Sequence, residues 1–478
     1  MFLFFTTLRW HSILAGAFLL LSIAVQAQES DPLPQAQSSF VFFEAIPAFG
    51  PDTSLALVHI HYRLKESFFV FVKDPSARNG ENFVARGELL VELLDQDKKS
   101  VAREVRQIHI PRTALPQPDE NLSDIVGVIP FLVPDGRYSI LFRVDDRESG
   151  RSFLNRDREL STRHAFPHAF ELSFPFLAEI RYSDDQSRPA KIIPKNLGGT
   201  AIFGSSGGFA LQAQPPSPNL PLTLRWIITR ERLPDRQAVN PTALLTIFSE
   251  TDLILSAFEN QPLEGSQFTL LDGYLKPKIE RNDFFYEPTD GSTGWKVLFI
   301  PLPLEKLIPW PRYKIHLTVV SGTSKKEETY YFGIAWPNRP RSLSDPKTAL
   351  EALSHIASDS EMTAIQSGSF GNMARAFVNF WRKYDPDTTS VYNEVMEEYY
   401  QRVDKAIEKF SSLKNQDGFK TDRGRIMILF GPPSRTNRVL ATDNTLLEIW
   451  TYDNIGRRFT FADRGRSGNF ILVKTEEL

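Results

Sequence analysis

Apolar and polar residues alternate along most of the first 340 residues, which is the pattern of β-strands that bury one face. The alternation is clear over residues 57–62, 89–93 and 101–110, and an unbroken apolar run covers 126–133. Gly, Pro and Asp separate these runs, and such residues form tight turns. We therefore expect this part of the chain to consist of short strands joined by firm turns.

One strand pattern occurs twice. Its shared residues are Ile-Pro at 129–130 and 300–301, and Arg-Tyr at 137–138 and 312–313. Each tyrosine opens a run that is apolar at every second position, and a hairpin and a further strand follow. We interpret the copies as one supersecondary unit near the end of each of two β-sandwiches, similar to the tyrosine corner of immunoglobulin-like folds. The alternative is that Arg-Tyr after Gly or Pro is merely a common strand start.

The periodicity becomes helical after a proline-rich linker at 337–346, where Asp345 is a candidate N-cap and Pro346 a candidate first residue of a helix. Apolar stripes then recur at about 3.6-residue spacing. The longest stripe runs over six turns between residues 391 and 410, with Ser390 as its candidate cap. We expect a segment of amphipathic helices here.

A small sheet is expected after these helices. Residues 425–430 are expected to form a strand, and their positions 426–430 are all apolar, which predicts a central strand that is buried on both faces. We expect Gly418 to end the long helix and Gly424 to adopt a backbone angle that other residues resist. Gly-Pro-Pro at 431–433 ends the strand, because proline cannot donate to a ladder. Three more strands, at 446–452, 458–461 and 470–473, complete the sheet on which the long helix packs.

A set of residues around this predicted strand has a distinctive spacing. Its members are Gly418, Phe419, Thr421, Asp422, Arg423, Gly424, Arg425, Gly431, Pro432, Trp450 and Arg464. With residues 380–386 upstream, they resemble the GWxTD-domain family of bacterial proteins. The tryptophan of that family is Phe419 here, which keeps a flat apolar surface but lacks the indole N–H. The resemblance covers roughly the last quarter of the chain and implies no established activity, so it transfers no catalytic residue.

Composition excludes several classes of protein. A length of 478 residues suggests about three domains. The formal net charge of −3 is too near neutral for a general nucleic-acid binder. The chain contains no cysteine, which excludes disulfides, thiolate metal sites and cysteine nucleophiles. We expect no cofactor and no metal site.

Residues 1–27 have the features of a secretory signal. Arg9 and His11 precede an apolar run at 13–25, and Val-Gln-Ala at 25–27 offers small residues for cleavage. The alternative is an uncleaved membrane anchor, for which the run is short. No second long apolar run follows, so we expect a periplasmic or secreted protein without a membrane span once the signal is cleaved.

Two local motifs invite a chemical interpretation. His59 and His61 share one strand face and could begin a metal site, but no third ligand is near in sequence, so we expect a solvated face. Residues 204–208, Gly-Ser-Ser-Gly-Gly, fit the spacing of a nucleophile elbow. That elbow needs a helix after it, whereas a strand pattern follows here, so we expect a turn within a sandwich.

Three carboxylates near the C-terminus are candidate catalytic residues: Asp422, Glu448 and Asp463. One interpretation is a polar cleft in which Asp422 or Glu448 acts as a base and an arginine binds an anion. The other is a structural network, in which Asp422 accepts backbone N–H bonds and pairs with an arginine. The last 120 residues contain no histidine, the commonest general base.

Together these patterns predict a mostly β multidomain protein with two immunoglobulin-like β-sandwiches, a helical segment and a small α/β domain. The expected boundaries are 1–27 for the signal, 38–170 and 175–338 for the sandwiches, 345–413 for the helices and 414–478 for the GWxTD-like domain. We expect a non-enzymatic binding or assembly module of the cell envelope whose partner is a protein or a glycan. The alternative function is a hydrolase that acts on an envelope polymer through the C-terminal carboxylates.

Overall fold

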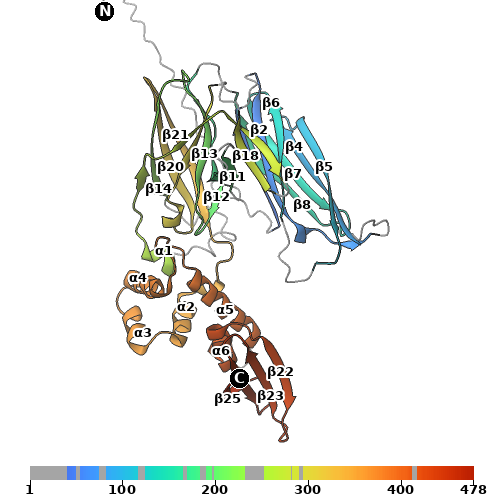
Figure 1. The fold of residues 1–478 in the computed structure, drawn as a ribbon, viewed down its shortest axis with the longest axis vertical. Helices are drawn as coiled ribbons and strands as arrows, with labels where there is room; N and C mark the ends of the chain where they lie inside the picture. Colours follow the sequence, from blue (N-terminus) through green and yellow to red (C-terminus); the bar gives the residue numbers. More distant parts are fainter. Residues whose placement is uncertain are drawn as a thin grey trace, which may run out of the picture.

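The computed structural model describes residues 40–49, 54–74, 82–116, 124–164, 169–182, 190–195, 199–231, 252–280, 283–289, 294–411 and 417–478. The predicted signal at 1–27 lies outside the described residues. Strands predominate over helices, which confirms a mostly β protein. Figure 1 shows two β-rich bodies side by side, with helices and a small sheet below them.

The alternating segments at the start of the chain form two antiparallel sheets. Sheet 1 contains β1 (Val41–Ala48), β2 (Ala56–Lys65) and β6 (Asp124–Val133). Sheet 2 contains β3 (Val72–Lys73), β4 (Phe83–Leu94), β5 (Ser100–Arg112), β7 (Gly136–Asp146) and β8 (Ser152–Thr162). The predicted strands at 57–62, 89–93, 101–110 and 126–133 are thereby confirmed.

The next part of the chain forms two more sheets. Sheet 3 contains β9 (Glu171–Leu172), β10 (Phe176–Arg181), β11 (Lys191–Pro194), β13 (Gly208–Gln214), β16 (Thr269–Asp272), β17 (Tyr274–Glu280), β18 (Asp283–Thr289) and β19 (Lys296–Pro301). Sheet 4 contains β12 (Thr200–Ile202), β14 (Leu222–Arg230), β15 (Leu263–Gly265), β20 (Trp310–Ser321) and β21 (Ser324–Ala335).

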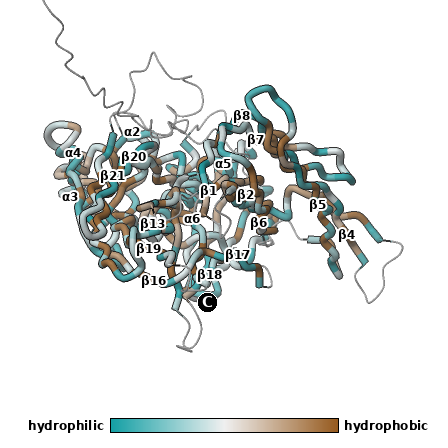
Figure 2. Tube along the Cα trace, turned by 90° about the horizontal axis from the view of Figure 1, so that it is seen from above, coloured by the Kyte–Doolittle hydropathy of each residue, from teal (hydrophilic) through white to brown (hydrophobic). Residues whose placement is uncertain are grey.

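The four sheets stack in the order 2, 1, 3, 4, and an apolar layer fills each of the three spaces between them. Between sheets 2 and 1, Phe142 stacks on Phe43 with ring centroids 4.2 Å apart. Between sheets 1 and 3, Val128 packs in a cluster with Phe299. Figure 2, the view from above, shows β4 and β5 at one end, then β1, β2 and β6, then β13 and β19, then β20 and β21. Sheets 1 and 3 therefore bury both faces.

The repeated tyrosine makes the same bond in both copies. The Tyr138 hydroxyl donates to the carbonyl oxygen of Pro134 at 2.7 Å, and the Tyr313 hydroxyl donates to that of Ile308 at 3.0 Å. Both rings are buried at the start of the strand that opens a hairpin, β7–β8 or β20–β21. Burial raises the pKa of Tyr313, which keeps its hydroxyl protonated as a donor. Each bond pins a strand to the loop that precedes it.

Helices continue the core of sheets 3 and 4. They are α1 (Leu253–Ala257), α2 (Pro346–Ala352), α3 (Asp359–Gln366), α4 (Phe370–Trp381), α5 (Glu394–Phe410) and α6 (Asp422–Phe430). The 3₁₀ turns among the described residues are Glu66–Phe68, Leu304–Lys306, Arg341–Ser344, Leu353–His355, Arg382–Tyr384 and Gly418–Lys420. Asp345 caps α2 and Pro346 is its first residue, as predicted. One hydrophobic cluster runs from sheets 3 and 4 through α2–α5 and reaches Phe419 and Ile428.

The predicted linker at 337–346 is packed rather than free. The Asp404 carboxylate of α5 accepts hydrogen bonds from the backbone N–H groups of Arg341 and Ser342, at 2.6 and 2.9 Å. Leu343 is buried in the shared cluster. The predicted boundaries at 338 and 345 therefore fall inside one continuous core, and the division into separate domains stays a prediction.

The predicted strand at 425–430 is wrong, because these residues belong to helix α6. The Thr421 side chain accepts from the Gly424 N–H at 3.0 Å and caps the helix. Residues 426–430 of the helix are all apolar because this part lies between two cores: Ile426 and Met427 face one cluster and Ile428 faces the other. A short apolar run has the same pattern in a buried strand and in a buried helix.

Three related predictions are also wrong. Helix α5 ends at Phe410, and Gly418 begins a 3₁₀ turn instead of ending the helix. Gly424 has ordinary helical geometry, and it must be glycine because a Cβ there would collide with the Gly418 carbonyl. Asn393, not Ser390, caps α5 by accepting from the Met396 N–H at 2.8 Å.

The small C-terminal sheet exists, but it is built differently from the prediction. Sheet 5 is antiparallel and contains β22 (Arg435–Leu440), β23 (Leu446–Tyr452), β24 (Arg457–Asp463) and β25 (Ile471–Glu477) in that order. The last three strands confirm the expected ones, and β22 takes the place of the mistaken strand. Helix α5 packs on α6, and its Phe410 ring meets the Trp450 ring of β23 at 5.7 Å. Of the helices within the described residues, none has the length together with the apolar character that a membrane crossing requires.

We expect Tyr313→Phe to lower the free energy of unfolding by about 1 kcal/mol, because it leaves the buried Ile308 carbonyl without its donor. Urea denaturation, monitored by far-UV circular dichroism, measures the change. The matched control is Tyr182→Phe, since the Tyr182 side chain is 63% exposed and should change stability by less than about 0.5 kcal/mol. Equal effects of the two substitutions would contradict a structural role for the repeated tyrosine.

Candidate functional site

The predicted site residues gather where α6 begins. Thr421 Oγ1 donates to the Gly418 carbonyl at 2.7 Å and accepts from the Gly424 N–H, so the 3₁₀ turn and the helix share one hydroxyl. Phe419, at the tryptophan position of the motif, is buried against His355 with ring centroids 6.5 Å apart. The His355 Nε2 lies 3.0 Å from the Phe419 carbonyl oxygen. The turn is therefore anchored to the helical core by both side chain and backbone.

Glu448 of β23 is the centre of the charged cluster. Its Oε2 lies 3.4 Å from Arg423 Nη1 and 2.9 Å from Arg438 Nε. Its Oε1 accepts a hydrogen bond from the Trp450 indole at 2.8 Å. The side chain of Glu448 is only 4% exposed, so this carboxylate depends on these three donors for its solvation.

Arg423 connects the cluster to the loop that follows β24. Its Nη2 donates to the Gly468 carbonyl at 3.0 Å, and its guanidinium lies over the rings of Phe410 and Phe470, at 4.8 and 4.1 Å from their centroids. Burial lowers the pKa of Arg423 and Glu448 opposes that shift, so the group stays a cation. The arginine thus lies between two aromatic rings and is held by two oxygen acceptors.

Asp463 binds backbone groups of the loop after β24, and Asp422 binds a backbone group of β25, the next strand. Asp463, at the end of β24, accepts from the N–H groups of Ser467 and Gly468, at 3.1 and 2.8 Å. Asp422 Oδ2, in the first turn of α6, accepts from the Leu472 N–H of β25 at 2.8 Å. The two carboxylates therefore hold the β24–β25 connection against the N-terminal end of α6.

The remaining motif residues lie around this corner. Arg425 is half exposed and lies 3.9 Å from Asp422, and Arg464 is exposed. Gly431 has φ of 77° and ends α6, and its carbonyl accepts from the buried Tyr452 hydroxyl at 2.8 Å. Pro432 follows at the turn into β22. The structure thus brings Asp422, Arg423, Glu448 and Asp463 together but leaves Arg425 and Arg464 at the surface.

Both carboxylate oxygens of Glu448 and of Asp463 accept hydrogen bonds inside the protein, and Asp422 accepts one at Oδ2. Two of the three carboxylates are buried, Glu448 at 3% and Asp463 at 2% exposure, and Asp422 is held between a backbone N–H and an arginine. A general base needs an accessible lone pair directed at a substrate proton. These lone pairs are directed at structural donors, so the arrangement is suited to fixing a corner of the fold.

The other two motifs lie far from this corner. Ser205 Oγ donates to the Ile202 carbonyl at 2.6 Å in a turn between β12 and β13, which confirms a turn and no nucleophile elbow. His59 and His61 do share a strand face, but the predicted solvated face is wrong, because both are buried between sheets 1 and 3. Within the described residues, no group of three or more His, Cys, Asp or Glu side chains is placed to hold a metal ion.

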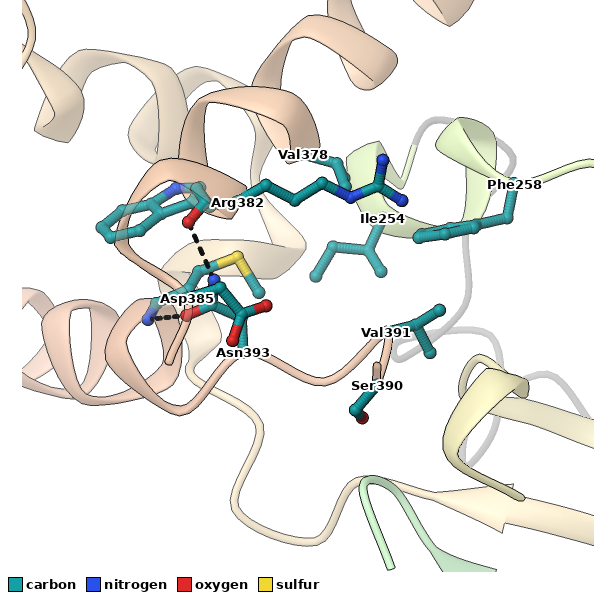
Figure 3. Close-up of a pocket in the computed structure, with 10 residues that line it drawn as sticks. Ile254, Phe258, Val378, Arg382, Asp385, Ser390, Val391 and Asn393 are labelled. Carbon is teal, nitrogen blue, oxygen red and sulfur yellow. Dashed lines mark hydrogen bonds between the residues drawn. The ribbon is translucent and has the colours of Figure 1, made fainter. Parts of the chain in front are cut away.

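A small pocket lies between α1, α4 and the start of α5 (Figure 3). Ile254, Val378 and Met396 form apolar walls, and Arg382 and Asp385 contribute charged groups. Its volume of about 20 Å³ is room for a single water molecule. None of the predicted site residues lines it.

Sequence reasoning missed two partners of the cluster. Arg438 lies on β22, which was not predicted because its six residues, exposed throughout, lack alternation. The signal available was Asp443-Asn444, a turn pair between two β-compatible runs, where Asn444 has φ of 62°. Gly468 binds through its backbone alone, which leaves no residue-type signal.

We expect Glu448→Gln to lower the free energy of unfolding by about 3 kcal/mol, because Arg423 would lose its buried counter-ion while the shape of the side chain is kept. Guanidinium denaturation measures the effect. Asp453→Asn in the same sheet is the control: its ion pair with Arg435 is exposed and should contribute less than about 1 kcal/mol. A Glu448→Gln protein as stable as the control would mean that the network is not structural.

Comparison with known proteins bears on the same region. Residues 317–477 match the model of the GWxTD domain, from within β20 to the last residue of β25. No curated protein is significantly similar to the chain. The matched range contains every motif residue at the α6 corner, with phenylalanine at position 419. The chain is therefore a GWxTD-domain-containing protein.

Proposed function

We propose that this protein is a non-enzymatic binding or assembly module, exported to the cell envelope, whose two β-sandwiches are immunoglobulin-like. The observation that carries the proposal is that the three candidate carboxylates form structural bonds at one corner. The charged residues of the domain therefore serve to build a rigid body. Binding by loops and edge strands is the common use of such a body.

The stacked sheets support a presenting role. Buried apolar layers join sheets 2, 1, 3 and 4 into one stack. The two tyrosine bonds support the immunoglobulin-like assignment, because each runs from a strand tyrosine back to the carbonyl of a residue four or five positions upstream. A rigid double sandwich holds two sets of loops at a fixed separation, which suits a protein or glycan partner.

Export is supported by the leader. The Arg9–apolar–Ala27 pattern is that of a cleavable signal. An envelope location would place the sandwiches beside the surface polymers and proteins that such folds bind.

The hydrolase alternative has less support. Glycosidase-like chemistry needs two accessible carboxylates on either side of a cleft, about 5–10 Å apart. Glu448 and Asp463 are buried, and the pocket in Figure 3 belongs to the helical segment, away from them. No specific contact favours a reaction over a structural role.

If export is correct, protein expressed in a bacterial host with its own leader will begin at Gln28 in the envelope fraction, because cleavage follows Ala27. Intact-mass measurement of the protein from the soluble envelope fraction tests this. Replacing Leu19 and Leu20 by arginine interrupts the apolar run and should leave full-length protein in the cytoplasm. Recovery of uncleaved wild-type protein only in membranes would favour the anchor instead.

Asp422→Asn separates a binding module from a hydrolase. We expect the melting temperature to fall by about 2–4 °C, since the bond to the Leu472 N–H loses its charge. Wild type and variant should release no soluble fragments from purified cell-wall glycan. The non-enzymatic proposal would be refuted if the wild type released soluble fragments and Asp422→Asn, at an unchanged melting temperature, did not. Asp404→Asn, which removes charge from another structural carboxylate, is the matched control.

A further inference from the structure

Four polar side chains lie inside the apolar layer between sheets 1 and 3. Glu44 of β1 and His61 of β2 are cross-strand partners, and His59 shares their face two residues earlier. Tyr286 of β18 reaches them from sheet 3. Their exposed fractions are 7%, 9%, 1% and 1% in that order. Apolar residues of both sheets surround them, including Ile46 and Phe176.

The Tyr286 hydroxyl bridges the two histidines. It lies 2.7 Å from His61 Nε2 and 2.7 Å from His59 Nδ1. A phenol carries one proton, so it donates to one ring nitrogen and accepts from the other. The histidine that accepts the phenol proton must be neutral, and burial lowers the pKa of both histidines, so near neutral pH both imidazoles are neutral in the closed interface.

Two atoms beside this bridge have no partner of their own. They are Nδ1 of His61 and Oε2 of Glu44, which belong to neighbouring side chains on one face. No direct hydrogen bond joins these two atoms. One water between them would let a protonated Glu44 carboxyl donate towards the His61 nitrogen, which would extend the His61–Tyr286–His59 bridge to Glu44.

Further contacts show that the interface closes around this bridge. The Gln212 side chain, fully buried in β13, clasps the Phe49 backbone with bonds of 3.1 and 3.0 Å to its N–H and carbonyl. The Phe49 ring packs on Trp295 at 5.2 Å. The Gly199 N–H binds the Glu44 carboxyl, so the first and second sandwiches meet at β1 as well.

We propose that Glu44, His61, Tyr286 and His59 form a proton-linked lock, which holds the two sandwiches together near neutral pH and releases sheet 1 from sheet 3 in acid. The lock is a property of the interface between sandwiches, so it goes beyond the proposed envelope function and does not depend on it. Its ligand is the proton, and its two states are the closed and the opened interface.

The environment of the four side chains favours opening of the interface in acid rather than in base. Burial, with His59 adjacent, lowers the pKa of His61 well below its usual value, and burial lowers that of His59 to about 4. Burial raises the pKa of Glu44 to about 7, against the pull of Arg158 on β8, whose Nη2 lies 4.0 Å away. Tyr286 stays protonated because burial raises its pKa. Within the described residues, β6, β10 and β11 contribute apolar side chains to this face.

Proton counting gives the pH dependence of opening. Between about pH 5 and 6, each histidine gains a proton on opening, because its ordinary pKa of about 6.5 lies above that pH and its closed-state pKa lies below it. Glu44 loses one, because its closed-state pKa is higher than its ordinary value. The net uptake of one proton makes the opening constant rise about tenfold per unit of acidification.

The absence of cysteine allows a direct measurement of opening. Val128→Cys places a thiol inside the interface, and Val105→Cys places one on an exposed strand position. The reaction rate of the first thiol with a dipyridyl disulfide, divided by that of the second at each pH, gives the opening constant. We expect this ratio to be lowest near pH 7, where proton gain by the histidines and proton loss by Glu44 balance, and to rise about tenfold between pH 6 and 5.

Variants of the lock change this slope in different directions. In the Val128→Cys background, Glu44→Gln removes the proton that is lost on opening, so the rise should become about a hundredfold per pH unit. His59→Gln removes one of the two protons that the histidines gain on opening. The ratio should then no longer change with pH between pH 6 and 5. General destabilisation shifts the level of the ratio but not its slope, so the Glu44→Gln result stands even if His59→Gln fails to fold.

Two controls separate opening from other events. His109→Gln, at an exposed histidine of β5, should leave the tenfold slope unchanged. Val319→Cys lies in the core between sheets 3 and 4 and should stay unreactive at pH 5, unless the whole protein unfolds. Slopes of Glu44→Gln and His59→Gln equal to the wild-type slope, or parallel exposure of Val319→Cys, would overturn the proposal.

Discussion

The structure depends on the burial of both faces of sheets 1 and 3. Sheet 1 packs against sheet 2 on one face and sheet 3 on the other, and sheet 3 packs against sheet 1 and sheet 4. A sheet that is covered on both sides has no solvated face on which polar side chains can lie, so each must find a partner inside. Gln212, Glu44 and the paired histidines meet this requirement with bonds across the layer. The same residues that satisfy the interface also fix the relative position of the two sandwiches.

Much of the β architecture could be predicted from alternation, because a strand with one face on a core repeats every second residue. The tyrosine pair was informative for a similar reason: a side chain that bonds its own preceding loop leaves a local signature. Contacts between residues that are distant in the sequence leave no such local signature. The burial of His59 and His61 is decided by β18, more than 200 residues away, and a sequence pattern of one strand cannot show which face another sheet will cover.

Helix α6 shows where periodicity fails. Its nine residues lie between the Trp450 core and the core of the helical segment, so nearly all its apolar positions are used. The sequence contains the two capping residues of this helix, Thr421 and Gly431, and these favour a helix over a strand once both are considered. The charged corner was predicted as a group, but its role was not. The backbone donors to Asp463 come from a loop whose conformation the residue types do not specify, and the donor to Asp422 comes from β25.

The range that matches the GWxTD domain begins inside β20, a strand whose ladder with β14 runs from Leu222 to Arg230. The matched segment therefore does not coincide with a separable piece of the molecule. Cutting the chain at residue 317 would divide β20, strip its neighbour β14 and expose the apolar underside of the helices that continue the same core. A fragment for transplantation or truncation should therefore extend upstream to include all of sheets 3 and 4, which share this core. The segment that matches the family is thus shorter than the segment that shares one hydrophobic core.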